Sequence, residues 1–265
     1  MHKLLRHAHI ARLFEVISSQ ASINLCMQHA AGGTLRELLD QHGALPEARA
    51  RRYLRQICGA LHYCHEVVHV VHRDIKLDNM LLDANDNVLL ADFGFAEVVG
   101  PNKRKLRLLC GSPHYSAPEI FAQQEYVGSH VDLWSLGVLL YVILSGCSPF
   151  CAEEEEQLLK QVAEAKYEFF ENEWKHISAE AKDIITRLLV VDPNKRMTMA
   201  ELLEHAQVAV DVLHVLVALL RVGREVERRP RRRRRHRVVH RHRLGARRRL
   251  LRRRPVSYTH LTLPT

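Results

Sequence analysis

Apolar positions recur with the spacing of α-helices in three long segments of the chain. Downstream of Pro46, apolar or small side chains follow a 3.6-residue period and predict a long helix with one buried face, formed by Ala50, Tyr53, Leu54, Ile57, Cys58 and Leu61. Residues 131–144 are apolar on nearly every side except at Asp132 and Ser135, which predicts a helix buried all round. A third, amphipathic helix is predicted by Ala181, Ile184, Ile185, Leu188 and Leu189.

Two helix starts carry a capping box, in which a Thr and a Glu three residues later satisfy free backbone donors. Thr34 and Glu37 follow two glycines and predict a helix that starts there. Thr198 and Glu201 predict a second such helix, which ends at His205.

Shorter apolar runs predict strands. Residues 13–17 and 23–27 read as two short strands joined by a polar turn. Residues 80–82 and 88–91 flank a turn rich in Asn and Asp, which predicts a β-hairpin.

The centre of that hairpin decides which polar side chains meet at its open end. Placing the centre between Asn85 and Asp86 pairs Asn79 with Asp92. Directly opposed residues of an antiparallel pair lie about 5 Å apart at Cβ, so an amide oxygen and a carboxylate would converge. Hard oxygen ligands of this kind suit Mg²⁺, which completes its coordination with phosphate and water.

Two further polar residues lie on the loop that enters the hairpin. The carboxylate of Asp74 could orient a hydroxyl, and Lys76 could steady a phosphoryl group in transfer. Taken singly, Asp74, Asp78 and Asp92 are each more simply read as loop caps, but that reading does not explain all of them together.

The motifs His72-Arg73-Asp74, with Asn79, and Asp92-Phe93-Gly94 reproduce both catalytic signatures of protein kinases. Over residues 4–205 the chain resembles serine/threonine protein kinases, and it is most similar to the calcium/calmodulin-dependent and AMP-activated group, on the evidence of Phe95, Cys110-Gly-Ser-Pro113 and Ala117-Pro-Glu119.

The resemblance implies an α+β, protein-kinase-like fold with a mainly helical large lobe and a β-hairpin stub of the small lobe. Residues 1–30 would be the remnant of the small lobe and hinge, and residues 31–205 the large lobe. In the family, the residue at the position of Asp132 holds the backbone of the catalytic loop.

The activity that the resemblance implies is transfer of the γ-phosphoryl group of ATP to Ser or Thr hydroxyls of protein substrates. Asp74 would orient the hydroxyl and Lys76 would stabilise the phosphoryl group. Asn79 and Asp92 would hold Mg²⁺, and the cofactors implied are ATP and Mg²⁺. Adenine would lie against the gatekeeper Met27 and a hinge that runs from Gln28 to Ala30.

The resemblance also assigns residues of the activation segment, which runs from Phe95 to Glu119. Ser112 would line the substrate pocket near Asp74, and Glu119 would pair with Arg196. Arg73 normally receives a phosphothreonine, but Leu108 stands at that position, so Arg73 is expected to lack its usual partner.

Several family features are missing from the sequence. No Gly-rich phosphate loop and no Val-Ala-Ile-Lys strand precede Ile10, while Gln28 and Thr34 stand where the family has Glu. We therefore interpret the chain as N-terminally truncated and expect it to be inactive as written. The alternative function is a non-catalytic, kinase-like interaction module.

Charge and cysteine content change the picture only at the C-terminal end. Residues 221–254 hold 18 Arg and 2 Glu, which turns a net charge of −7 on the remainder into +9 for the whole chain. The six cysteines show no CxxC spacing, which favours reduced thiols over disulfides or zinc ligands. The apolar stretch at the N-terminus is too short for a secretory signal. We expect a cytoplasmic protein, with the nucleus as the alternative.

From Ala206 to Pro255 the chain uses only ten residue types, all encoded by codons that begin with G or C. We interpret residues 206–265 as an out-of-frame, Arg-rich tail that ends in adapter-derived sequence, and we expect it to be disordered. An RNA-binding or nuclear-localisation tract at residues 231–235 and a membrane segment at residues 206–220 are the rival readings. The tract has no aromatic residue to stack on bases, and a span needs about 20 residues. We expect neither nucleic acid nor membrane as a partner.

Overall fold

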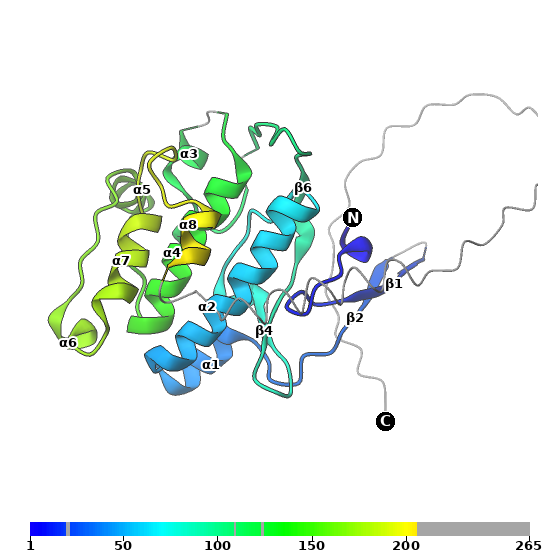
Figure 1. Ribbon diagram of the computed structural model, residues 1–265, viewed down its shortest axis with the longest axis horizontal. Helices are drawn as coiled ribbons and strands as arrows, with labels where there is room; N and C mark the ends of the chain where they lie inside the picture. Colours follow the sequence, from blue (N-terminus) through cyan, green and yellow to red (C-terminus); the bar gives the residue numbers. More distant parts are fainter. Residues whose placement is uncertain (20–21, 109, 123–124, 206–265) are drawn as a thin grey trace, which may run out of the picture. The chain divides into compact units, whose positions relative to one another are not determined.

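The computed structural model describes residues 1–19, 22–108, 110–122 and 125–205 (Figure 1). Residues 1–15 and 26–205 belong to one compact unit, while residues 16–25 group separately. The interpretation of residues 206–265 lies outside the described residues.

The described chain is mainly helical, as the sequence predicted (Figure 1). Its α-helices are α1 (Leu35–His42), α2 (Glu47–His62), α3 (Pro118–Phe121), α4 (Gly128–Ser145), α5 (Glu155–Ala163), α6 (Glu171–Trp174), α7 (Ala179–Leu188) and α8 (Met199–Glu204). Shorter turns are the 3₁₀ segments η1 (His2–Leu4), η3 (Leu77–Asn79), η4 (Phe93–Phe95) and η5 (Pro113–Tyr115), and the π-helical turn η2 (Tyr63–Val67).

The strands within the described ranges form three two-stranded sheets. Strand β1 (Leu13–Ser18) pairs with β2 (Ile23–Met27), β3 (Val70–Val71) with β6 (Glu97–Val98), and β4 (Met80–Leu82) with β5 (Val88–Leu90). The β3–β6 and β4–β5 pairs are antiparallel. The predicted strands at residues 13–17 and 23–27 are confirmed.

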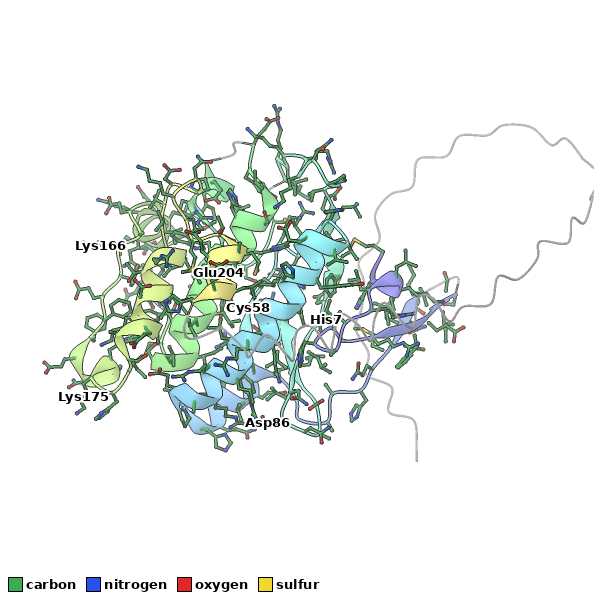
Figure 2. The ribbon with its side chains drawn as sticks, in the orientation of Figure 1. His7, Cys58, Asp86, Lys166, Lys175 and Glu204 are labelled. Carbon is green, nitrogen blue, oxygen red and sulfur yellow. The ribbon has the colours of Figure 1, made fainter. Side chains whose placement is uncertain are left out.

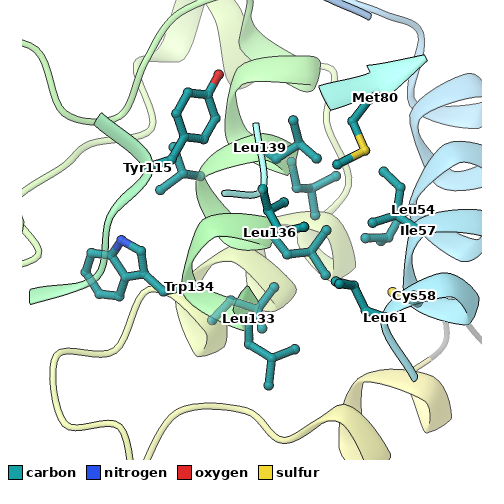
Figure 3. Packing of buried hydrophobic residues seen from close by; sticks show 14 of the residues in the cluster. Leu54, Ile57, Cys58, Leu61, Met80, Tyr115, Leu133, Trp134, Leu136 and Leu139 are labelled. Carbon is teal, nitrogen blue, oxygen red and sulfur yellow. The ribbon is translucent and has the colours of Figure 1, made fainter. Parts of the chain in front are cut away.

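Helix α4 lies at the centre of the core. Every one of its residues except His130 is buried, which confirms the helix predicted to be buried all round. Figure 3 shows Leu133, Leu136 and Leu139 of α4 facing the apolar side of α2. By length and composition α4 could cross a membrane, but 94% of its apolar window is buried inside the protein, as in the core helix of a globular domain.

Helix α2 begins directly after Pro46 and buries the six residues that its periodicity predicted, together with Ala60. Its polar side is joined to the β4–β5 turn through Asp86 (Figure 2), which accepts from Arg49 at 2.6 Å and also contacts Arg52 and Tyr53. The turn of the β4–β5 hairpin is therefore held against the core helix α2.

Both capping boxes are confirmed. At α1, the backbone N–H of Glu37 donates to the Thr34 hydroxyl at 3.1 Å, and the Thr34 N–H donates to the Glu37 carboxylate at 2.7 Å. At α8, Thr198 and Glu201 make the same pair of contacts. These reciprocal bonds fix the helix starts because they satisfy backbone donors that have no partner inside the helix.

The register of the β4–β5 hairpin differs from the prediction by one residue. Leu81 pairs with Leu89, so the hairpin is centred on Asn85, and the N–H of Ala91 donates to the carbonyl of Asn79 at 2.9 Å. Asn79 is thus opposite Ala91 and not opposite Asp92. The cause is the turn, in which the Asp83 carboxylate accepts from the N–H groups of Asn85 and Asn87, both at 2.8 Å.

The N–H of Asp86 donates to the carbonyl of Asp83 at 3.1 Å, and the turn ends in a residue with positive φ, as in a common three-residue hairpin loop. The residue is Asp86, with a φ of 61°. Asp92 lies one residue beyond the last pair, in a left-handed conformation of its own, with a φ of 57°.

Candidate active site

A buried carboxylate holds the loop between β3 and η3. Asp132 of α4 accepts from the backbone N–H groups of His72 at 2.9 Å and Arg73 at 2.7 Å, and its Oδ2 lies 2.7 Å from Nε2 of His65. Burial acts against ionisation of Asp132, but these hydrogen bonds and the nearby His65 and His72 leave its pKa below the usual value. The role that the resemblance implied for Asp132 agrees with this geometry.

Three predicted site residues meet in one hydrogen-bonded triangle. Nζ of Lys76 lies 2.8 Å from Oδ2 of Asp74 and donates to the Ser112 hydroxyl at 2.9 Å. That hydroxyl in turn donates to Oδ1 of Asp74 at 3.1 Å. Asp74 is buried, with 4% of its surface exposed, so its carboxylate is oriented by neighbours and not by bulk water.

The backbone at Gly111 brings Ser112 to this triangle. Gly111 has a φ of 101°, and a Cβ atom there would lie 2.8 Å from the carbonyl oxygen of Arg73. Only glycine allows this approach, because any side chain would meet a backbone atom that Asp132 already holds in place.

Asn79 is oriented by Asp74. Its side-chain amide nitrogen donates to the carbonyl of Asp74 at 2.7 Å and to Oδ2 of the same residue at 3.0 Å. Both donations come from the NH₂ group, so the amide oxygen is the end that points away from Asp74. Asn79 is buried, which fixes that orientation.

Asp92 follows β5 directly. Its Oδ1 accepts from the N–H of Gly94 at 3.1 Å, and the carbonyl of the preceding Ala91 lies 2.9 Å from Nε2 of His72. One amide oxygen and one partly exposed carboxylate at the end of a hairpin are ligands that fit Mg²⁺. No group of three or more His, Cys, Asp or Glu able to hold a metal ion occurs in the part of the chain that the structure describes, so phosphate and water would complete the coordination.

The predicted adenine-binding residues Met27 and Ala30 lie against strands β4 and β5, which connect Asn79 with Asp92. Met27 and Ala30 pack with Leu81 against a small buried cluster that includes Leu89 and Ala91. The N–H of Gln28 donates to the carbonyl of Arg12 at 2.7 Å. The hinge residues and the residue before Asp92 are therefore brought together by apolar contact.

Phe93 packs between two histidine rings, each with its centroid 4.7 Å away: His72 of the catalytic loop and His2 of η1. The His2 ring also lies 2.8 Å from the carbonyl of Ala11. Burial lowers the pKa of both histidines, which favours their neutral, apolar form beside Phe93. The contact of His2 was not predicted.

The far end of the activation segment is held by a buried ion pair. Arg196 donates twice to the Glu119 carboxylate, at 2.7 and 3.0 Å, and also to the carbonyl of His130 at 2.8 Å. The guanidinium lies 5.1 Å from the ring centroid of Trp134. The predicted pairing of Glu119 with Arg196 is confirmed, and the bidentate geometry is that of a strong charge-assisted contact.

Arg73 has partners other than a phosphothreonine. Its Nε donates to the carbonyl of Phe95 at 2.7 Å, its Nη1 donates to the Tyr126 hydroxyl at 3.4 Å, and its Nη2 lies 3.8 Å from Glu97. The side chain of Leu108 is 52% exposed. The prediction considered only the phosphorylation position and did not identify these partners, which come from other segments.

A pocket of about 590 Å³ opens beside the Asp74–Lys76–Ser112 triangle. Its walls include Lys76, Asn79, Ser112 and Tyr115. Two members of the triangle, Lys76 and Ser112, therefore line an open space.

Sequence reasoning missed three residues of this region: His2, His65 and Tyr126. His65 and Tyr126 lie outside the catalytic motifs, and their roles arise from contacts with segments more than 50 residues away. The alternation of polar and apolar residues does not encode such contacts. One signal could have pointed to His65 and Tyr126. Buried charged side chains such as Arg73 and Asp132 require partners, so further polar residues had to lie beside them.

These features define the large-lobe site of a protein kinase. Residues 1–208 match the family described as "Protein kinase domain", and the chain belongs to that family. It is 39% identical over 203 residues to the probable serine/threonine-protein kinase MARK-A of Dictyostelium discoideum, which covers 77% of this chain and 19% of that protein. It is 40% identical over 211 residues to the serine/threonine-protein kinase SIK2 of Gallus gallus, covering 79% and 25% respectively. The chain thus spans a quarter or less of the length of these relatives.

Proposed function

We propose that this site, when completed by a Gly-rich phosphate loop and a strand lysine, transfers the γ-phosphoryl group of ATP to Ser or Thr hydroxyls of protein substrates. The observation that carries the proposal is the triangle of Asp74, Lys76 and Ser112 beside an oriented Asn79. A buried carboxylate and a cation at hydrogen-bonding distance, beside an amide whose nitrogen contacts that carboxylate and whose oxygen points away from it, are the groups that phosphoryl transfer requires for positioning and charge neutralisation.

Asp74 is the group that receives the substrate hydroxyl. In the transfer, a bond forms between the hydroxyl oxygen and the γ-phosphorus, the bond from that phosphorus to the ADP oxygen breaks, and the hydroxyl proton passes to Asp74. Ser112 and Lys76 hold the two carboxylate oxygens in the free protein, so the incoming hydroxyl replaces a bond that is already oriented.

Two cations would offset the negative charge of the phosphates. One is Lys76, and the other is the Mg²⁺ that Asn79 and Asp92 would bind. When bound, Mg²⁺ neutralises phosphate oxygens during transfer. Asn79 presents its amide oxygen because Asp74 occupies its amide nitrogen, and Asp92 supplies the carboxylate. Met27, Gln28 and Ala30 would receive adenine on the apolar cluster next to Ala91.

The test is Mg²⁺-dependent binding of ATP, measured as the rise in melting temperature of the 265-residue chain. We expect ATP to raise it with Mg²⁺ and not with EDTA, because ligand that binds only the folded state stabilises it. Asp92→Asn should remove the Mg²⁺ dependence, whereas Asp40→Asn, at an exposed position of α1, should retain it. An equal rise in Asp92→Asn would exclude Asp92 as a ligand.

A further inference from the structure

We propose that Tyr126 is a positioning residue that holds the activation segment to Arg73 without a phosphate group. The inference rests on the proposed function, because it concerns the segment that would present protein substrates to Asp74. It assigns to Tyr126 the task that a phosphorylated side chain at position 108 would otherwise perform.

The Tyr126 hydroxyl bridges two segments. It accepts from Nη1 of Arg73 at 3.4 Å and donates to the backbone carbonyl of Leu108 at 2.8 Å. Tyr126 is 4% exposed, and its bond to Arg73 is buried, while its bond to Leu108 is partly buried. Burial raises the pKa of Tyr126, which keeps the hydroxyl neutral and able to donate.

Backbone and surface contacts support the same bridge. The N–H of Leu106 donates to the carbonyl of Tyr126 and the N–H of Tyr126 donates to the carbonyl of Leu106, both at 2.9 Å. One residue to either side, Arg107 donates to Glu125 at 3.0 Å. Backbone and side-chain hydrogen bonds therefore join residues 106–108 to residues 125–126.

The guanidinium of Arg73 links this bridge to the catalytic loop. Its Nε is bonded to the carbonyl of Phe95, near the start of the activation segment, while Tyr126 connects it to Leu108. The backbone N–H of Arg73 is bonded to Asp132. Two parts of the segment are thus joined to the residue that precedes Asp74.

The charge of Arg73 is met without a phosphate. A buried cation is costly unless its donors are satisfied, and Arg73 is 6% exposed. A carbonyl, a hydroxyl and the carboxylate of Glu97 at 3.8 Å supply the acceptors. Leucine at position 108 accepts no phosphoryl group, so these three acceptors take the place of a phosphate beside Arg73.

The experiment compares two Tyr→Phe variants of the 265-residue chain. Tyr126→Phe removes the bridging hydroxyl. Tyr141→Phe is the matched control, because its hydroxyl also donates to a backbone carbonyl, that of Glu168, at 2.6 Å, but within another region. The readout is the initial rate of trypsin cleavage after Arg104, Lys105 and Arg107, which are exposed.

We expect Tyr126→Phe to be cleaved at these sites about five to ten times faster than the wild type, as loss of a buried hydrogen bond should open the segment more often. Tyr141→Phe should be cleaved there at the wild-type rate. Equal rates in Tyr126→Phe and the wild type would overturn the proposal.

A rescue variant separates positioning from packing. Leu108→Glu in the Tyr126→Phe background introduces a carboxylate at the position where the resemblance places the phosphothreonine that pairs with Arg73. It should slow cleavage toward the wild-type rate, whereas a defect in packing would persist. If Tyr126→Phe does not fold, Leu108→Glu alone decides: unchanged protection supports the proposal, because Arg73 already has acceptors. A gain in protection would show that Arg73 had lacked a partner.

These readouts need neither ATP nor catalysis. If the wild-type chain shows no Mg²⁺-dependent binding of ATP but Tyr126→Phe is cleaved faster, the proposed function is rejected and this inference is kept. Normal binding with equal cleavage would do the reverse.

Discussion

At the scale of single residues, the stability of the catalytic loop depends on the ionised carboxylate of Asp132. It accepts from two backbone N–H groups of the loop and from His65, with none of its surface exposed. A neutral amide of the same shape would turn one acceptor into a donor and face these groups with repulsion.

We predict that Asp132→Asn lowers the free energy of unfolding by about 3–5 kcal/mol, because the amide leaves one of the three buried donors without an acceptor and weakens the bonds of the others. Urea denaturation measures it. Asp183→Asn is the matched control, because Asp183 also lies beside a histidine, His205 at 3.1 Å, but its side chain is 51% exposed. The control should change stability by less than about 1 kcal/mol. A cost for Asp132→Asn no larger than that of the control would contradict the account.

His7 makes stability depend on pH. Its ring stacks on Tyr63 with centroids 5.4 Å apart, and its Nδ1 accepts from the N–H of His9 at 3.1 Å. Burial, together with the nearby His9 and His62, lowers the pKa of His7 to about 4. The unfolded chain, with a His pKa of about 6.5, takes up this proton first, so the stabilising effect is complete above pH 6.5 and is lost as the pH falls toward 4.

The expected loss from this one group between pH 6.5 and pH 4 is up to about 3 kcal/mol. Denaturation at a series of pH values should show a weaker pH dependence in His7→Gln than in the wild type. His29→Gln, at an exposed position, should keep the wild-type dependence. An unchanged slope in His7→Gln would remove His7 as the cause.

At the same scale, sequence reasoning located the residues that lie inside motifs. Asp74, Lys76 and Ser112 meet as the resemblance implied, and Glu119 pairs with Arg196. It did not identify the partners of Arg73, because Tyr126 and the carbonyl of Phe95 reach this guanidinium only through the tertiary fold.

At the scale of elements, two helix glycines differ in how closely a neighbouring segment packs against them. In α4, a Cβ atom at Gly137 would lie 2.8 Å from Cβ of Leu188, so α7 packs directly on the glycine. In α2, a Cβ atom at Gly59 would meet only the His7 ring, at 3.6 Å, an ordinary contact.

We therefore predict that Gly137→Ala lowers the free energy of unfolding by about 1–3 kcal/mol through overpacking. Gly59→Ala should leave it unchanged or raise it by up to about 1 kcal/mol, because alanine favours the helix. Urea denaturation of both variants tests the close approach of α4 and α7. Equal effects of the two substitutions would show that the helices do not pack as described.

The helices and the hairpin were predictable because periodicity and caps are local. The hairpin register was not, since it depends on hydrogen bonds from the Asp83 side chain inside the turn, which move the centre from between Asn85 and Asp86 to Asn85. A shift of one residue placed Asn79 opposite Ala91. The metal-site hypothesis therefore rests on the sequence of the two motifs and on the contact between Asn79 and Asp74, and not on strand pairing.

At the scale of the whole molecule, the chain is a member of the protein kinase family whose described part is mainly the large lobe. Its sequence contains neither a Gly-rich phosphate loop nor a Val-Ala-Ile-Lys strand. Under the proposed function, the groups described here orient the acceptor hydroxyl and hold Mg²⁺, and a Gly-rich loop with a strand lysine supplies the clamp for the triphosphate.

Transfer of the γ-phosphoryl group from labelled ATP to a Ser peptide tests the central claim most directly. It should be measured in the 265-residue chain and in a version extended before Met1 by a Gly-rich loop and a lysine-bearing strand. We predict negligible transfer by the chain alone and clear transfer by the extended version, abolished by Asp74→Asn and retained in Asp40→Asn. Transfer that survives Asp74→Asn, or an extended version that binds ATP and Mg²⁺ without any transfer, would contradict the account and favour a non-catalytic interaction module.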